Sequence, residues 1–171
     1  MAEARVLDGK AVWVTGSSRG IGRVIAGHLA SLGARVAVHG TGPYSTRAFG
    51  EAASLKAVAE AIAEKHGADV ISVYGDLTTE STVKRVVAEI RDRFGQIDIL
   101  VNCAGGDIGS QGTMGENAGK PAGNDPVNIS VEDIRTVLDR NLMTCILCCR
   151  EVAPEMMKRQ RSWIVNIGSI A

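Results

Sequence analysis

Three glycines near the amino terminus have a spacing that suits the binding of a phosphate group. They lie in Thr15-Gly16-Ser17-Ser18-Arg19-Gly20-Ile21-Gly22, with the pattern G-x-x-x-G-x-G. Gly16 would permit a tight turn, while Gly20 and Gly22 would let the backbone approach a diphosphate. A helix that begins here would offer unpaired N–H groups to an anion. The Gly-Lys-Ser/Thr sequence of a mononucleotide loop is missing, so the pattern favours a dinucleotide over a mononucleotide, and a glycine-rich turn without a ligand is the alternative.

The elements that must position this loop alternate between short apolar runs and longer amphipathic stretches. Strands are expected at Ala11–Thr15, Arg35–His39, Val70–Tyr74, Ile97–Val101 and Trp163–Ile167. Helices are expected from Gly20 to about Leu32, from about Ala52 to His66, over Thr79–Phe94, and from Ser130 to about Gln160. This order predicts an α/β fold with a doubly wound parallel sheet, a Rossmann fold, as a single domain over residues 1–171. Such a sheet brings the carboxyl ends of its first and fourth strands together, where ligands bind.

Two stretches between these elements are irregular. One covers Gly40–Gly50, and the other covers Gly105–Asn128 and is rich in glycine. The second is long for a compact domain, which predicts a functional lid or a mobile loop.

Composition excludes several other classes of function. The formal net charge is zero and no basic stripe is visible, so we expect no nucleic-acid partner. The apolar runs are too short to span a bilayer and the first ten residues do not form a signal sequence, so we expect no membrane partner and a cytoplasmic location. Cys145, Cys148 and Cys149 share a predicted helix without a histidine, so we expect reduced, buried thiols and no metal site.

The segment T-G-S-S-R-G-I-G resembles the phosphate loop of the short-chain dehydrogenase/reductase family, particularly members similar to 3-oxoacyl-carrier-protein reductases. The resemblance extends over essentially the whole chain. Asn102-Cys103-Ala104-Gly105 is similar to the family's N-N-A-G motif, with Cys103 in place of the second Asn. It implies an oxidoreductase that transfers a hydride between a nicotinamide dinucleotide and a carbonyl or secondary alcohol substrate.

The resemblance also implies roles for individual residues. Ser169, after the fifth strand, matches the catalytic Ser that holds the substrate oxygen, and Asn141 matches the catalytic Asn of the proton relay. A core Asn bonded to backbone remains the alternative for Asn141, and a helix cap remains the alternative for Asp76. The residues implied in cofactor binding are Gly16, Ser18, Arg19, Gly20, Ile21, Gly22, Thr41, Asp76, Leu77, Asn102, Ala104 and Gly105.

The end of the second strand bears on which nicotinamide cofactor is bound. An NAD enzyme typically carries an acidic residue there, but this strand ends His39-Gly40-Thr41 and the next carboxylate is Glu51. Arg19 could pair with a 2′-phosphate through its guanidinium group, or be only an exposed charge at a helix start. The charge pattern therefore predicts NADP, with NAD less favoured.

The family's proton donor, a Tyr followed four residues later by a Lys, is missing from these residues. The two tyrosines are Tyr44 and Tyr74, and the residues four positions on are Ala48 and Thr78. We therefore expect a chain truncated after its fifth strand, with negligible turnover by itself. The competing hypothesis is a noncatalytic dinucleotide-binding sensor or scaffold that lacks the acid.

Substrate and assembly are less constrained by the sequence. The stretch Gly105–Asn128 is longer than in the carrier-protein reductases, which argues against an acyl-carrier substrate. The resemblance implies a homo-oligomer, a tetramer or dimer, that packs partly through the long helix Val131–Gln160.

Overall fold

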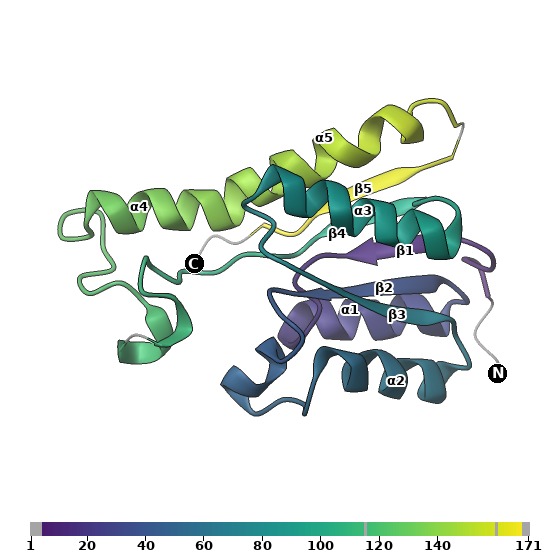
Figure 1. Cartoon of the computed structure of the whole chain (residues 1–171), viewed down its shortest axis with the longest axis horizontal. Coiled ribbons are helices and arrows are strands. Elements are labelled where there is room, and N and C mark those ends of the chain that lie inside the picture. The colour runs from purple at the N-terminus through teal and green to yellow at the C-terminus, as the bar shows by residue number, and fades with distance from the viewer. Residues whose placement is uncertain (1–4, 115, 160, 169–171) are drawn as a thin grey trace.

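The computed structural model describes residues 5–114, 116–159 and 161–168, and a sheet of five parallel strands forms its centre (Figure 1). The strands are β1 (Ala11–Val14), β2 (Arg35–Gly40), β3 (Val70–Tyr74), β4 (Ile99–Asn102) and β5 (Trp163–Asn166). Their order is β3-β2-β1-β4-β5, so the chain reverses its direction across the sheet between β1 and β4. A doubly wound sheet forms its ligand crevice at this position. The predicted fold class is confirmed.

Helices cover both faces of the sheet, and the sequence pattern of the strands decides which residues meet them. The helices α1 (Gly20–Ser31) and α2 (Leu55–His66) pack on one face, and α3 (Glu80–Phe94) and α5 (Thr144–Met156) pack on the other (Figure 1). Within β1, Val12 and Val14 contact the first pair, whereas Trp13 contacts the second. Because successive side chains of a strand point to opposite faces, two apolar cores form around one buried sheet.

The predicted long helix after Ser130 is interrupted, which corrects that prediction. Ser130 caps α4 (Val131–Leu138) by accepting a hydrogen bond from the N–H of Asp133, as expected. A π-helical turn, η4 (Asp139–Met143), then separates α4 from α5, which ends at Met156. The predicted end at Gln160 lies outside the described residues. Such turns are frequently found at functional sites, and this one contains Asn141.

The two irregular stretches contain short 3₁₀ helices. Residues 41–54 include η1 (Ser45–Phe49), and the segment after β4 includes η2 (Gly112–Met114) and η3 (Glu116–Gly119). Both stretches lie beyond the carboxyl ends of the strands, on the left in Figure 1. They therefore flank the edge at which the sequence places the binding residues.

The edge strand β5 is exposed along its length. Its side chains Trp163 and Val165, with Leu7, Ile25 and Leu29, are among those that line an apolar groove of about 480 Å³ on the face that carries α1. In the part of the chain that the structure describes, no helix combines the length and apolarity needed to cross a membrane.

Candidate functional site

The glycine loop between β1 and α1 is packed so closely that it has no room for side chains at two positions. Gly16 has a φ of +65°, and a Cβ atom there would lie 2.7 Å from the Cα of Ala104. A Cβ atom on Gly22 would lie 2.5 Å from the carbonyl oxygen of Gly16. The loop, the start of α1 and the end of β4 are therefore in backbone contact, as a phosphate-binding turn requires.

Thr15 joins the glycine loop to the end of β4. Its side chain is buried, and its Oγ1 accepts hydrogen bonds from the N–H groups of Cys103 and Ala104, at 2.9 and 3.0 Å. These bonds place the ends of β1 and β4 side by side. From the sequence, Thr15 is expected only as the last residue of the first strand, with no part in the site.

His39, at the end of β2, fixes the other side of the same loop. Its Nδ1 accepts the N–H of Gly16 at 3.2 Å, and its Nε2 lies 3.0 Å from the carbonyl oxygen of Gly75, so the proton belongs on Nε2. Its own N–H donates to the buried Oγ of Ser17 at 2.8 Å. One imidazole thereby connects the glycine loop, β2 and the end of β3.

This arrangement requires a neutral imidazole. His39 is buried, and desolvation lowers its pKa from 6.5 to about 4, against the opposing effect of the hydrogen bond to Gly75. A protonated ring could not accept the N–H of Gly16. His39 was not among the predicted site residues, although a polar side chain near the end of an otherwise apolar strand is a signal that could have identified it.

The side chain of Asn102 connects β4 to its neighbours. Its Nδ2 donates to Oδ1 of Asn166 at 2.9 Å and lies 3.3 Å from Sγ of Cys149. Its Oδ1 is buried and accepts no hydrogen bond from the residues that the structure describes. The ends of β4 and β5 and the helix α5 thus meet around one amide.

Asn141 projects from the π-helical turn η4 toward the segment after β4. Its Oδ1 accepts the N–H of Gly106 at 3.0 Å, and its Nδ2 donates to the carbonyl oxygens of Gly106 and Val137, at 3.0 and 2.7 Å. The residue is exposed and does not lie in the core, but its amide is bonded to backbone. Asn141 therefore bonds to backbone groups, and it also lies beside Gly105 and Gly106.

The other predicted residues lie at the same edge with one exception. Ser18 is buried, Arg19 is the N-cap residue of α1, and Ile21 and Thr41 are exposed. Ser169 lies outside the described residues, so its predicted position stays untested.

Asp76 and Leu77 follow β3 and have different environments. The Oδ1 of Asp76 accepts from the N–H and hydroxyl of Thr78, while Thr79 is the N-cap residue of α3, so Asp76 orders the turn before the helix and does not cap it directly. Leu77 is buried in the core beside α3. Leu77 can therefore offer only backbone groups to a ligand.

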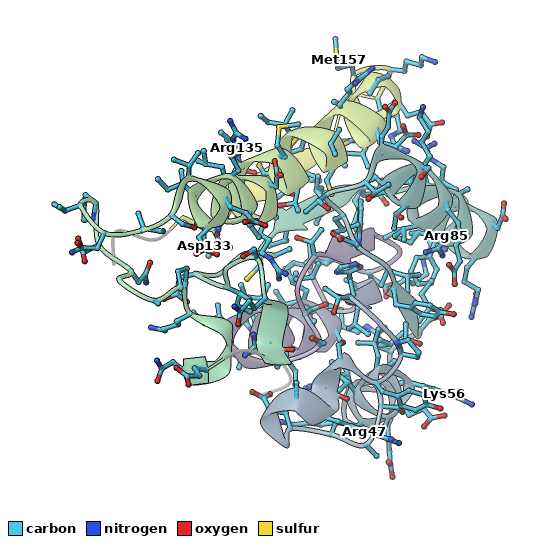
Figure 2. All side chains as sticks on the ribbon, turned by 60° about the vertical axis from the view of Figure 1, so that its left-hand side comes forward. Arg47, Lys56, Arg85, Asp133, Arg135 and Met157 are labelled. Atoms are coloured by element: carbon cyan, nitrogen blue, oxygen red, sulfur yellow. The ribbon has the colours of Figure 1, made fainter. Side chains whose placement is uncertain are left out.

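The segment after β4 is attached to α4 through Asp133. Its Oδ1 accepts from the N–H of Ser110 at 2.8 Å and from the Ser110 hydroxyl at 2.9 Å. These bonds, with one from the Ser130 hydroxyl, hold the pKa of Asp133 below its usual range. Figure 2 shows Asp133 on the side of α4 that faces this segment. These hydrogen bonds therefore hold the segment after β4 against α4, beside the carboxyl edge of the sheet.

The cysteines of α5 differ in burial. Burial raises the pKa of Cys148 to about 12, and it also raises the pKa of Cys145. Over the described ranges, no group of three metal-ligating side chains is found. Cys148 is buried as expected, whereas Cys145 and Cys149 are half-buried.

Comparison with known proteins places this geometry in a family. The family model for short chain dehydrogenases matches residues 10–171. A 2,3-dihydroxy-2,3-dihydro-p-cumate dehydrogenase from Pseudomonas putida is 34% identical over 95% of this chain and 54% of its own length. A 3-oxoacyl-[acyl-carrier-protein] reductase from Aquifex aeolicus is 37% identical over 96% of this chain and 57% of its own length. The chain thus spans about half the length of the curated relatives it matches.

A solved structure shows the same fold. The NADH-dependent reductase A1-R′, responsible for alginate metabolism, superposes with a TM-score of 0.76 at 25% identity. The superposition covers 97% of this chain and 61% of that chain.

Proposed function

This chain belongs to the short-chain dehydrogenase family, and we propose that it binds a nicotinamide dinucleotide along the carboxyl edge of its sheet for hydride transfer to or from a carbonyl or secondary alcohol. The observation that carries the proposal is the backbone packing of Gly16 against Ala104 and of Gly22 against Gly16. This packing holds the loop close to β4 at the start of α1, where the first N–H groups of the helix suit a diphosphate.

The residues at this edge also fit the nicotinamide end of the dinucleotide. Ala104 and Gly105 let a ring pass close to the backbone, and the buried Oδ1 of Asn102 remains without a described partner. When bound, the nicotinamide would supply or accept the hydride. Asn141 would hold the segment at Gly106 and support the proton relay through its amide, and Ser169 would orient the substrate oxygen. We propose a small carbonyl or alcohol compound as the substrate, received beside the segment that Asp133 anchors.

We further propose that NADP is preferred over NAD. β2 ends at Gly40 and is followed by Thr41, so the strand end lacks the acidic residue that would hydrogen-bond the ribose of NAD and repel a 2′-phosphate. Arg19, at the N-cap of α1, would pair with that phosphate. NAD is the alternative, since the A1-R′ reductase is NADH-dependent.

Replacing Arg19 tests this preference directly. We expect Arg19→Gln to weaken NADPH binding about tenfold and NADH binding less than about twofold, because only NADPH carries the phosphate that the guanidinium would meet. The measurement is the titration of nucleotide fluorescence with wild type and variant. Arg135→Gln is the matched control, since Arg135 lies on α4, away from the glycine loop (Figure 2). Equal losses for both nucleotides, or tighter binding of NADH by the wild type, would refute the preference.

The exposed apolar face of α4 and α5 supports the proposal of a homo-oligomer. Side chains at helical spacing remain exposed along this face; they are Val131, Ile134, Leu138, Leu142 and Ile146. A contiguous apolar stripe of this kind marks a surface for another protein, and self-association through a two-fold axis is its commonest form.

Sedimentation velocity tests the oligomer. We expect a dimer or tetramer for the wild type and a smaller species for Leu138→Lys, because the charge would be buried without a partner in the interface. Met157→Lys is the control: this exposed methionine is the C-cap residue of α5, and Figure 2 shows it at the end of α5 that is remote from α4. A monomeric wild type would contradict the proposal, as would an unchanged mass of the Leu138→Lys variant.

A further inference from the structure

The segment between β2 and α2 folds back over the start of α1. It covers residues 41–54 and includes η1, which lies beside the amino-terminal end of α1 in Figure 1. A Cβ atom on Gly40 would lie 2.5 Å from Oγ of Ser45 and 3.1 Å from Cβ of Ser18, so the beginning of this segment is packed directly on the glycine loop.

Internal hydrogen bonds give this segment a defined shape. Thr46 is buried, and its Oγ1 donates to the carbonyl oxygen of Ala52 at 2.9 Å. The Nε of Arg47 donates to the carbonyl oxygen of Ala53 at 2.7 Å, and Figure 2 shows Arg47 on the short helix η1. Glu51 lies immediately before these two acceptors, and its own N–H donates to the carbonyl oxygen of Thr46 at 3.2 Å, so backbone hydrogen bonds help to position it.

Glu51 uses its carboxylate to contact the phosphate-binding end of α1. Its Oε2 accepts the N–H of Gly20, the first residue of α1, at 3.2 Å. Its carbonyl oxygen accepts a hydrogen bond from Nη1 of Arg23, also at 3.2 Å. A negative side chain thus lies where the helix start favours an anion.

We propose that Glu51 is an internal anion that competes with the diphosphate of the cofactor for the start of α1. This inference rests on the proposed function, because the competing ligand is the dinucleotide. The diphosphate requires the N–H groups at the helix start, and the carboxylate already uses one of them. Binding must therefore displace Glu51, and the negative charge that remains nearby opposes the incoming phosphates.

The direction of the effect separates this proposal from a supporting role for Glu51. A residue that helps to build the site lowers affinity when it is replaced, whereas a competitor raises affinity. The contact is exposed and involves one hydrogen bond, so we expect replacement to tighten binding about three- to tenfold. NAD and NADP should both gain, since both carry the diphosphate.

The test compares wild type with Glu51→Gln and Glu51→Ala in fluorescence titrations with NADH and NADPH. Glutamine removes the charge and keeps the length of the side chain, and alanine removes the acceptor as well. Glu60→Gln is the matched control, because this exposed glutamate lies on α2 and pairs with Lys56. A shift of the Gly20 amide resonance in both Glu51 variants, recorded without nucleotide, would verify that the contact exists in solution.

The outcomes are distinguishable from those of the proposed function. If the wild type binds neither nucleotide, the proposed function fails. If the wild type binds and the two Glu51 variants bind with equal or lower affinity, the competition by Glu51 is refuted. A gain restricted to NADPH also refutes it, because Glu51 would then act on the 2′-phosphate and not on the diphosphate.

Discussion

Gly16→Ala is expected to lower the affinity for a nicotinamide dinucleotide by about two orders of magnitude or more. An alanine at this position would have to adopt a φ of +65°. Its Cβ atom would lie 2.7 Å from the Cα of Ala104 and 2.9 Å from the carbonyl oxygen of Cys103. Both are backbone atoms that cannot rotate away, so the turn and the end of β4 must separate. Overpacking of this kind typically costs about 1–3 kcal/mol, and the left-handed backbone adds about 1–2 kcal/mol.

Other glycine variants show whether the loss of affinity is caused by the close contact between residue 16 and Ala104. Gly20→Ala is the comparison for backbone strain alone, because Gly20 has a φ of +53° and nothing within 4 Å of its Cβ position. Gly27→Ala, within α1, controls for the substitution itself. If Gly16→Ala does not fold, as judged by circular dichroism, Gly22→Ala replaces it, since its Cβ would press on the carbonyl oxygen of Gly16. Affinities of Gly16→Ala and Gly22→Ala within about threefold of the wild type would contradict a diphosphate site at this turn.

His39 is expected to make the protein sensitive to mild acid. The unfolded chain has a histidine pKa near 6.5, and the pKa in the folded protein is lowered to about 4, so the unfolded state binds the proton first. The contribution of His39 to stability is therefore complete above pH 6.5 and is lost as the pH falls toward 4. The two pKa values correspond to about 3 kcal/mol of unfolding free energy over this range.

Denaturant unfolding at several pH values measures this effect. The difference in unfolding free energy between wild type and His39→Gln should fall by about 3 kcal/mol from pH 7 to pH 4, because glutamine does not titrate. His28→Gln provides the control, since it removes an exposed imidazole from α1. Parallel curves for wild type and His39→Gln would show that the imidazole does not need to be neutral in the folded protein.

Much of the fold could be predicted from local pattern. Buried parallel strands are continuous apolar runs, and β1 and β4 were recognised in this way; the glycine at position 67 also marked the end of α2 correctly. The break between α4 and α5 could not be predicted from periodicity, because a π-helical turn changes the spacing by a single residue. It depends on the bonds of Asn141 to Gly106, which is distant in sequence.

The candidate site also contains residues that the local sequence reveals and residues that it does not. The glycine motif was visible because glycine serves a backbone need that no other residue meets. Thr15 and His39 carry no such mark, since their roles depend on partners that only the folded sheet brings near. Glu51 illustrates this most clearly. In the sequence it lies well after the end of β2, but in the fold the segment that contains η1 brings its carboxylate to the N–H of Gly20.

A crystal structure of the protein with NADP bound would show where the dinucleotide lies. We expect the diphosphate to contact the backbone N–H groups between Gly20 and Gly22, the nicotinamide to lie beside Asn102–Gly105, and Glu51 to have moved away from Gly20. A dinucleotide found elsewhere, for example in the apolar groove between α1 and β5, would contradict this expectation.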